Sequence, residues 1–325
     1  MTALPADPAP RLTVAVPTCN GEPHLAEALA GVLAQQGAMF DLLVCDDRSD
    51  DRTVDRVREL AGDRARIEIN PERLGLAGNW NRAVTLSRTP WVAVFHQDDV
   101  MRPGDLASRL GAIERPGAES LGLIAGPADV IDQSGRPVPP EIVEYGGLAE
   151  PPTGRFVDFP PGAFASRLEA SNLLRCSAVT TSKLAHEAVG GFDPSYRYVV
   201  DWDFWLRVAD RFAVTWIAQE PKVSVRWHAA SETHRFKVGL DDLEETERLL
   251  TRRSVRPGRR LARAYLNRAH DALRAGRVDL ARTALDRAVA ISPAVLTSIL
   301  ADPRLAAQMA TLRLAPRLAR RWFAR

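Results

Sequence analysis

Lysine and cysteine are both scarce in this chain of 325 residues: each occurs three times, against 40 arginines. The cysteines, Cys19, Cys45 and Cys176, lack the spacing of metal ligands, and bridging two of them would leave the third unpaired. This pattern argues against a cysteine metal site. It favours reduced thiols in a cytosolic protein over a disulfide framework.

Long apolar runs are absent as well. No uninterrupted apolar run approaches the roughly 18 residues of a membrane-spanning helix. Residues 1–10 show neither a basic start nor an apolar segment, so no signal peptide can be read. With 46% hydrophobic and 26% charged residues, the composition is that of a soluble globular protein with one large or two smaller domains. We therefore expect a cytoplasmic protein.

Glycine-rich phosphate-binding patterns are also missing. The chain has no G-x-G-x-x-G turn after its first apolar run and no G-x-x-x-x-G-K-[S/T] segment. A nucleotide bound by this chain would depend on carboxylates, amides and a metal ion, because no glycine loop is there to surround its phosphates.

Acidic residues are few toward the end of the chain. Residues 251–325 hold 17 Arg and 4 Asp, a net charge of +13, whereas the remainder, with 26 basic and 37 acidic residues, carries −11. Such asymmetry is typical of a protein with an anionic partner, either a membrane surface or a nucleic acid. It can equally reflect the preference of the whole chain for arginine, and the sequence leaves both explanations open.

The chain does contain a pair of acidic residues directly after a predicted strand. Residues 91–95 are apolar without alternation, as in a strand that is buried on both faces of a parallel sheet, and Asp98 and Asp99 follow. Open α/β sheets bind ligands at the carboxyl ends of their strands, and carboxylates suit Mg²⁺ or Mn²⁺. The pair predicts a site for a metal and a diphosphate, with a solvated turn as the alternative.

Apolar runs and helical patterns alternate along the first part of the chain. The pattern predicts strands over residues 12–16, 40–45, 67–69, 91–95 and 121–125, with helices over 22–37, 53–61, 77–87 and 103–114. This alternation is typical of a doubly wound, mostly parallel α/β sheet. The first, second and fourth strands end in polar residues, which we expect along one edge of the sheet.

The later parts of the chain are less regular. Residues 135–161 hold seven of the 23 prolines and predict a long irregular loop. Residues 262–275 and 278–291 flank Gly276 and predict a helix-turn-helix similar to a single tetratricopeptide-type unit. Residues 305–325 are amphipathic and rich in arginine. They fit a segment on an anionic membrane surface or a tail packed against the core.

Seven motifs, taken in order, resemble those of the family 2 glycosyltransferases, which have the glycosyltransferase-A fold. The resemblance covers about residues 11–235, and the motifs are residues 16–21, 44–53, 75–81, 96–99, 189–193, 201–207 and 225–228. Their number and order make the resemblance far more specific than any single motif. It implies an enzyme that takes a sugar from a nucleotide sugar, with divalent Mn²⁺ or Mg²⁺ as cofactor.

The resemblance implies that the loops after the first and second strands hold the nucleoside of the donor. It assigns nucleotide-sugar binding to Pro17, Thr18, Asn20, Asp46, Asp47, Asn81, Gln97 and Asp98. Taken alone, Asp46 and Asp47 also fit the start of a helix, although Asp50 and Asp51 fit that role better. Asn81 also fits an ordinary surface position of a helix.

The metal motif of the family is D-x-D, and this chain departs from it at the first position, which is His96. The resemblance implies that Asp98 and Asp99 bind the metal, with His228 as a further ligand. The departure matters little if the first position contacts the nucleotide, and more if a carboxylate ligand is lost there. For His228, the alternative is a structural role after a strand.

Asp201 stands where the resemblance places the catalytic base. An inverting transfer needs one carboxylate to take the proton of the acceptor hydroxyl. A helix N-cap is the alternative, because a helical stripe of apolar residues begins at Phe204. The family has an acidic residue before the base, and Val200 in its place would affect the choice of acceptor.

We therefore predict a glycosyltransferase-A catalytic domain over residues 1–240 and a helical region over 241–325. The expected partners are a nucleotide-sugar donor, a saccharide or lipid-linked acceptor in surface polysaccharide synthesis, and no nucleic acid. Peripheral contact of the basic C-terminal region with the inner face of a membrane stays open. The competing classes are a non-catalytic nucleotide-sugar-binding or scaffold protein and a sugar nucleotidyltransferase. The latter would need a glycine-rich loop with Arg and Lys.

Overall fold

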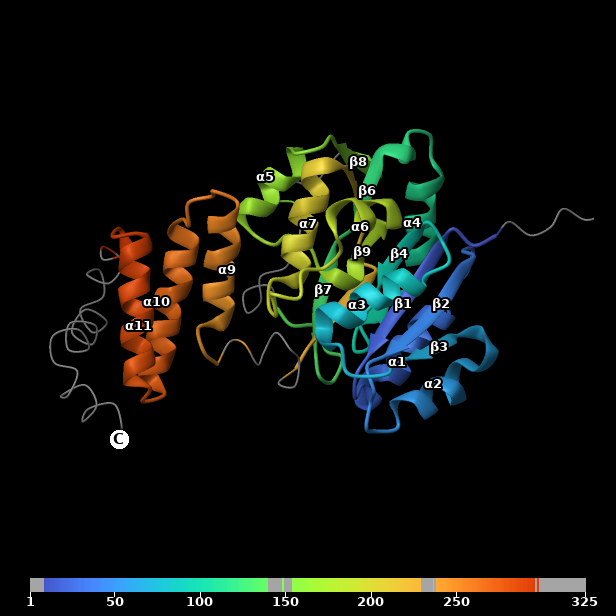
Figure 1. Cartoon of the computed structure of the whole chain (residues 1–325), viewed down its shortest axis with the longest axis horizontal. Coiled ribbons are helices and arrows are strands. Elements are labelled where there is room, and N and C mark those ends of the chain that lie inside the picture. Colours follow the sequence, from blue (N-terminus) through green and yellow to red (C-terminus); the bar gives the residue numbers. More distant parts are fainter. Residues whose placement is uncertain are drawn as a thin grey trace, which may run out of the picture. The chain divides into compact units, whose positions relative to one another are not determined.

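A computed structural model of the chain describes residues 9–139, 148, 154–228, 236, 238–295 and 297. The chain divides into two compact units, Met1–His228 and Ala229–Arg325. The strands lie in the first unit, and the described elements of the second are helices (Figure 1). The assignment of residues 1–240 to catalysis and of 241–325 to a helical region stays a prediction.

An eight-stranded, mostly parallel sheet forms the centre of the first unit. Its strand order is β3-β2-β1-β4-β9-β6-β10-β8, in which β9 and β8 run antiparallel to their neighbours. Its strands are β1 (Leu12–Thr18), β2 (Phe40–Asp46), β3 (Arg66–Ile69), β4 (Trp91–Val94), β6 (Leu121–Ala125), β8 (Phe156–Phe159), β9 (Val179–Ser182) and β10 (Ala213–Ile217). The predicted α/β class is confirmed.

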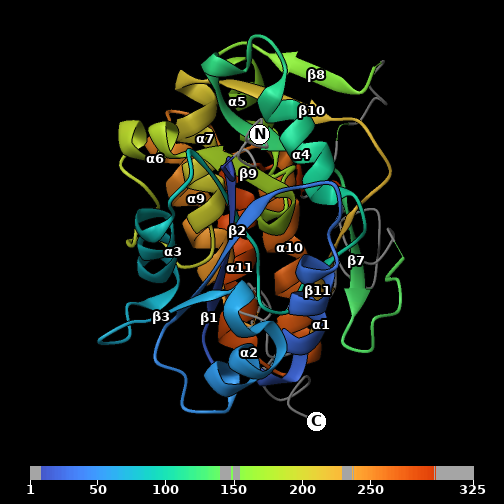
Figure 2. The same cartoon turned by 90° about the vertical axis from the view of Figure 1, so that its right-hand side faces the viewer.

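Helices cover both faces of this sheet. In Figure 2, α3, α6 and α7 lie on one side of the strands, and α1 and α4 lie on the other. The helices are α1 (Glu22–Leu33), α2 (Thr53–Ala61), α3 (Gly75–Leu86), α4 (Asp105–Glu114), α5 (Ala163–Ala170), α6 (Lys183–Val189) and α7 (Val200–Arg211). The sheet is therefore doubly wound, as the alternation of strands and helices predicts.

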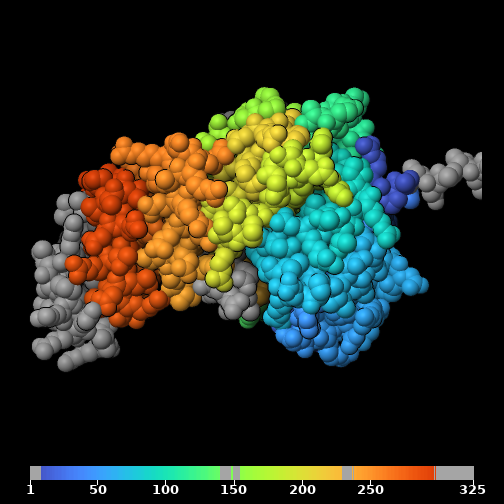
Figure 3. Space-filling model, viewed as in Figure 1, coloured from blue at the N-terminus to red at the C-terminus, as the bar shows by residue number. Residues whose placement is uncertain are grey.

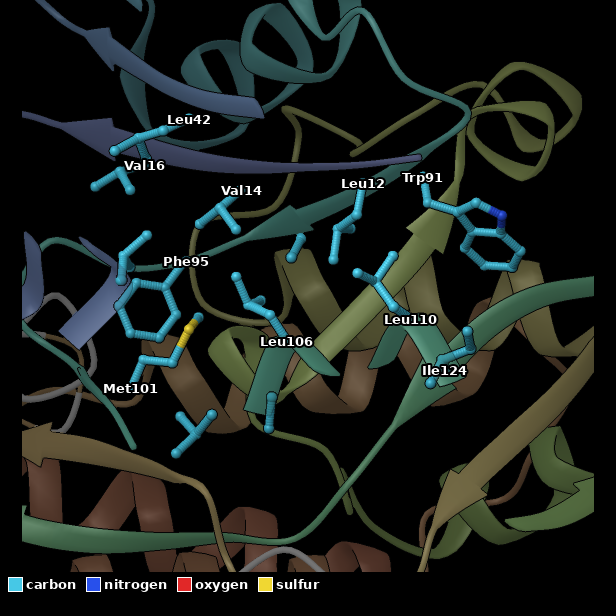
Figure 4. Packing of buried hydrophobic residues seen from close by; sticks show 14 of the residues in the cluster. Leu12, Val14, Val16, Leu42, Trp91, Phe95, Met101, Leu106, Leu110 and Ile124 are labelled. Atoms are coloured by element: carbon cyan, nitrogen blue, oxygen red, sulfur yellow. The ribbon is translucent and has the colours of Figure 1, made fainter. Parts of the chain in front are cut away.

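The apolar run of β1 accounts for its central place. All of its residues are buried, and β2 and β4 pair with it in parallel on either side. Leu12, Val14 and Val16, at alternate positions, join one apolar core with Leu106 and Leu110 of α4 (Figure 4). Since alternate side chains of a strand point to opposite faces, the residues between them serve the second helix layer.

A second sheet of three strands carries residues toward the edge where β1, β2 and β4 end. In it, β11 (Val223–Trp227) lies between β5 (Val100–Met101) and β7 (Ala128–Asp132). Asp99 directly precedes β5, and His228 directly follows β11. The pairing of β5 with β11 thus brings together two segments that are far apart in the sequence.

Several short elements of the sheet leave no clear pattern in the sequence. The prediction of an irregular loop over residues 135–161 is wrong for β8, whose four residues pair antiparallel with β10. Strand β9 is equally short and contains two threonines and a serine, so it has no apolar run to find. Its pairing with β4 on one side and β6 on the other fixes it as a strand.

The second unit contains α9 (Asp241–Arg252), α10 (Arg259–Arg274) and α11 (Val278–Ile291). The predicted helix-turn-helix is confirmed, and Gly276 at its turn has a φ of 72°, a conformation that glycine adopts without a steric penalty. Arg268 of α10 binds Asp242 of α9, with 2.8 Å between Nη2 and Oδ2. The amphipathic segment predicted over 305–325 lies outside the described residues. No described helix combines the length and the apolar character that crossing a membrane requires.

A buried histidine lies between the sheet and α7. His186 of α6 makes a 2.7 Å hydrogen bond between its Nε2 and Oγ1 of Thr181, and its ring packs 4.3 Å from that of Phe204, centroid to centroid. Burial, with smaller contributions from the positive charges of Arg207 and Lys183, lowers the pKa of His186 from its ordinary 6.5 to about 3. The folded protein therefore holds this side chain neutral.

This histidine should make the protein less stable in mild acid. The unfolded chain takes up a proton on this histidine near pH 6.5, whereas the folded chain does not. The free energy of unfolding should therefore fall steadily as the pH is lowered from 6.5 to about 3. By about pH 5 the loss should be roughly 2 kcal/mol. Urea unfolding of the wild type and His186→Gln at about pH 7 and pH 5 measures it, since glutamine does not titrate. Equal losses in both proteins would contradict the assignment.

Candidate active site

Polar side chains gather where β1, β2 and β4 end, at one edge of the sheet. The carboxylate of Asp46, which closes β2, accepts hydrogen bonds at 2.8 Å from Oγ1 of Thr18 and at 2.6 Å from Oγ of Ser49. Asp46 and Thr18 are both buried. These hydrogen bonds therefore connect the ends of β1 and β2, where the two loops assigned to the nucleoside begin.

Asp47 directly follows β2, and its side chain lies at the start of α3. Its carboxylate accepts hydrogen bonds from the backbone N–H groups of Leu74 and Gly75, at 2.7 and 2.9 Å, and from the side-chain amide of Asn70 at 2.8 Å. The first N–H groups of a helix have no partner inside it, and a negative charge is favourable there. Of the two roles considered for Asp47, nucleoside binding and the start of a helix, the contacts within the protein match the second, and the helix is α3. Contact with the nucleoside stays a prediction.

The loop after β1 is held from two sides. Asn20 has a φ of 50°, and its Oδ1 accepts a 2.8 Å hydrogen bond from the backbone of Asp50. Gln97 uses both ends of its amide on the backbone of Cys19, at 2.9 and 3.1 Å. Pro17 lies within β1 and is buried. These residues set the shape of the loop, whatever else they contact.

Asp51 has the role that the sequence favours for it. Its Oδ1 accepts a 2.9 Å hydrogen bond from the backbone of Thr53, the first residue of α2, and its Oδ2 a longer one from the backbone of Glu22 in α1. Asp50 instead pairs with Arg73. One acidic side chain therefore joins the starts of two helices.

The side-chain amide of Asn81 in α3 binds the backbone of the segment that follows α6. Its Nδ2 donates to the carbonyl oxygen of Phe192, and its Oδ1 accepts from the N–H of the same residue, both at 2.8 Å. A side chain at Gly191 would place its Cβ 2.6 Å from Oδ1 of Asn81, so glycine permits this approach. Figure 3 shows α3 in cyan against the yellow-green segment after α6. Asn81 thus supports the site by positioning this segment.

Asp98 lies beside His228, as the resemblance implies. The distance from Oδ2 of Asp98 to Nε2 of His228 is 3.0 Å, and the backbone carbonyl of Asp98 accepts from Nε of Arg226. Burial acts to raise the pKa of Asp98, but the hydrogen bond from His228 and the nearby ring of His96 outweigh it and lower the pKa below its usual value. Asp98 is therefore a charged carboxylate at neutral pH.

Asp99 is fully enclosed by protein. Its two oxygens accept hydrogen bonds from the backbone N–H of Arg226, at 2.9 Å, and from Oγ of Ser177, at 2.5 Å. Burial, together with the adjacent charge of Asp98, raises the pKa of Asp99 to about 6. Asp99 therefore links the strand β11 to the segment before β9.

His96 completes a group of possible metal ligands. One ligand atom from each of His96, Asp98 and Asp99 lies within 4.8 Å of the others. The His96 ring stacks on that of Trp80, with 5.2 Å between centroids and 29° between planes. Within the described part of the chain, its buried Nε2 has no hydrogen-bond partner. Two carboxylates and an imidazole are a donor set that fits a divalent cation.

Asp201 is the second residue of α7, so the N-cap alternative is wrong: the N-cap position is Val199. Oδ1 of Asp201 lies 2.6 Å from the backbone nitrogen of Trp202 and 3.4 Å from Nδ2 of Asn172. Burial raises the pKa of Asp201, although the hydrogen bond from the backbone of Trp202 and the nearby side chains of His96 and Arg175 oppose this.

Several residues of the site were not singled out by the sequence. Ser177 bonds both the backbone of His96 and Asp99, and the buried Arg109 donates to the carbonyl of Ser177 at 2.6 Å. Asn79 donates to the carbonyl of Cys45 in β2 at 3.0 Å and to that of Thr18 in β1 at 3.5 Å. Ser177 and Arg109 belong to no motif, whereas Asn79 lies inside the motif over residues 75–81.

A model of the glycosyl transferase family 2 matches residues 13–143, which contain the acidic loops and the His96–Asp99 segment. The chain is a family 2 glycosyltransferase. Of the classes that the sequence leaves open, this one holds.

Two relatives of this glycosyltransferase illustrate the match. It is 27% identical to the uncharacterized protein MT1568 of Mycobacterium tuberculosis over 253 residues, which cover 74% of the chain and 75% of that protein. It is 26% identical over 140 residues to WfgD of Escherichia coli, named as a UDP-Glc:alpha-D-GlcNAc-diphosphoundecaprenol beta-1,3-glucosyltransferase. That match covers 42% of the chain and 54% of WfgD.

Two solved structures share the fold of the glycosyltransferase. TarS of S. aureus, in complex with UDP-GlcNAc, superposes with a TM-score of 0.57 at 15% identity, over 93% of the chain and 79% of TarS. The mannosyltransferase PcManGT of Pyrobaculum calidifontis, in complex with GDP-Man and Mn²⁺, gives 0.52 at 18% identity, over 98% and 84%. Both show the glycosyltransferase-A fold that the resemblance implies.

Asn81→Ala should cost about 1–3 kcal/mol of stability, because it leaves the buried backbone N–H and C=O of Phe192 without their partners. Urea unfolding measures the loss. The control is Thr85→Ala, an exposed residue of the same helix whose hydroxyl donates to the carbonyl of Asn81. It should change stability by no more than about 0.5 kcal/mol. An Asn81→Ala protein of full stability would contradict the positioning role.

Proposed function

We propose that this glycosyltransferase is metal-dependent and inverting, and that it moves a sugar from a UDP-sugar or another nucleotide sugar to a saccharide or lipid-linked acceptor. The observation that carries the proposal is the approach of Asp98, Asp99 and His96 to one another at the sheet edge. The loops assigned to the nucleoside end at the same edge.

The residues present fit a divalent cation. Asp98 is charged and half-buried, and a buried carboxylate and an imidazole lie beside it. Asp98 and Asp99, with His228 next to Asp98, would hold Mn²⁺ or Mg²⁺, which as a Lewis acid supplies stabilisation of the departing diphosphate. The complex of PcManGT with GDP-Man and Mn²⁺ supports a metal in this fold.

The donor would lie across the loops after β1 and β2. Thr18 and Asp46 end β1 and β2, at the base of these loops. Oδ2 of Asp46 accepts from the hydroxyls of Thr18 and Ser49 and Oδ1 from the backbone N–H of Ser49, so Oδ1 keeps one lone pair for a nucleoside N–H or hydroxyl group. Gln97 and Asn20 hold the loop in the shape that receives the base.

Asp201 would act as the general base. It takes the proton of the acceptor hydroxyl as that oxygen attacks the anomeric carbon and the bond from that carbon to the diphosphate oxygen breaks. The nucleoside diphosphate leaves with the bonding electrons, and the sugar carbon inverts. The raised pKa of Asp201 makes it a stronger base than an ordinary aspartate.

The acceptor class rests on similarity. WfgD acts, by its name, on a GlcNAc-diphosphoundecaprenol, which is a lipid-linked sugar diphosphate. This supports a role in building a surface polysaccharide for the present chain, with UDP-glucose as one donor to try first. Cytoplasmic location and peripheral membrane contact belong to the same proposal.

Asp98→Asn should remove metal-dependent donor binding. The amide keeps the size of the side chain but loses its charge, so the affinity for UDP-glucose in the presence of Mn²⁺ should fall on the order of 100-fold. Isothermal titration with and without Mn²⁺ measures this. Asp132→Asn, at the last residue of β7, where the carboxylate accepts hydrogen bonds from the backbone of the following turn, is the matched control and should bind like the wild type. Unchanged affinity in Asp98→Asn would refute the metal site.

Asp201→Asn should separate binding from transfer. Donor affinity should stay within about twofold of the wild type, whereas the turnover should fall by roughly 100- to 10,000-fold, because asparagine cannot take the proton. The release of UDP is followed with a panel of saccharide and lipid-linked acceptors. Asp203→Asn, in the same turn of α7, tests whether any loss of charge has this effect. Substantial turnover in Asp201→Asn would remove it as the base.

A further inference from the structure

The site contains two histidines, and their ring nitrogens differ in what already occupies them. Nε2 of His228 is 3.0 Å from Oδ2 of Asp98, the length of an ordinary hydrogen bond. In His96, by contrast, Nδ1 lies 3.7 Å from Oδ2 of Asp99, too far for a hydrogen bond. Its Nε2 is buried and has no hydrogen-bond partner among the described residues. Ligation through His96 would therefore break no existing hydrogen bond, whereas ligation through Nε2 of His228 would break one.

The His96 ring is also held in place. It stacks on Trp80, which is itself buried, and the His96 backbone N–H donates to Oγ of Ser177 at 3.0 Å. The same Ser177 hydroxyl donates to Asp99. One serine thus fixes the backbone of His96 and the carboxylate of Asp99 relative to each other. A metal ligand that is already oriented loses less freedom when the ion binds.

We propose that His96 is a direct nitrogen ligand of the cation, alongside Asp98 and Asp99, and that His228 instead orients Asp98 by donating its N–H. This inference rests on the proposed function, because it assumes that a divalent cation is bound. Metal-binding carboxylates are commonly held by such a hydrogen-bonded neighbour. If His96 is a ligand, the relative affinities of the site for different metal ions change.

An imidazole ligand changes the order of metal affinities. Mg²⁺ keeps to oxygen ligands, whereas an imidazole nitrogen favours first-row transition ions, and affinity at a nitrogen-containing site rises from Mn²⁺ to Co²⁺. The site should therefore bind Co²⁺ more tightly than Mn²⁺, and Mn²⁺ more tightly than Mg²⁺. A site of three carboxylates would discriminate less between them.

Pulsed electron paramagnetic resonance of the Mn²⁺-loaded full chain tests the ligand directly, because it detects the coupling of the ion to a bound ¹⁴N. We expect ¹⁴N coupling in the wild type, its loss in His96→Gln, and its retention in His228→Gln. His24→Gln is the matched control, since the His24 ring lies 5.0 Å from that of His228. Coupling that persists in His96→Gln and disappears in His228→Gln would overturn the assignment.

Metal titration of His96→Asp gives a second measurement, which a folding defect in His96→Gln does not affect. Restoring a carboxylate should reduce the preference for Co²⁺ over Mg²⁺ by on the order of tenfold relative to the wild type. An unchanged preference would overturn the inference while leaving the proposed function intact. A wild type that binds none of the three ions would overturn the metal dependence itself, so the two failures are distinguishable.

Discussion

The position of the site depends on one buried carboxylate, that of Asp99. It accepts hydrogen bonds from the side chain of Ser177 and from the backbone of Arg226, so three segments that are far apart in the sequence meet at one side chain. A buried carboxylate without such donors would be costly, and the three segments are therefore held together. Because Asp98 directly precedes Asp99, the same junction places it against His228 after β11.

Most polar residues of the motifs bind the protein's own backbone. Asp47 bonds the first N–H groups of α3, Asn81 bonds both backbone groups of Phe192, and Gln97 bonds both those of Cys19. Loops at a sheet edge have no ladder to satisfy their N–H and C=O groups, so side chains must do it. A motif can thus mark a site although many of its residues hold the backbone in place. Within the described part of the chain, Nε2 of His96 is a buried polar atom of the site that has no such partner.

What could be predicted from the sequence is what depends on neighbouring residues. The strands over Leu12–Thr18 and Trp91–Val94 follow from apolar runs, and the acidic pair after β4 follows from its position. Ser177 could not be predicted, because its role arises only when the segment before β9 reaches Asp99. Among the described residues, Nε2 of His96 has no hydrogen-bond partner. This could not be predicted either, because it depends on segments that are far away in the sequence.

The side chain of Asp201 has a contact within the fold as well as the role in the reaction that is proposed for it. Among the described residues, its hydrogen bonds go to Oδ1, from the backbone of Trp202 and the amide of Asn172. These bonds orient the carboxylate within the first turn of α7, where N–H groups lack partners inside the helix. In the proposed reaction, the other oxygen, Oδ2, would receive the proton. The helix-start contact and the proposed base would therefore use different atoms of one carboxylate.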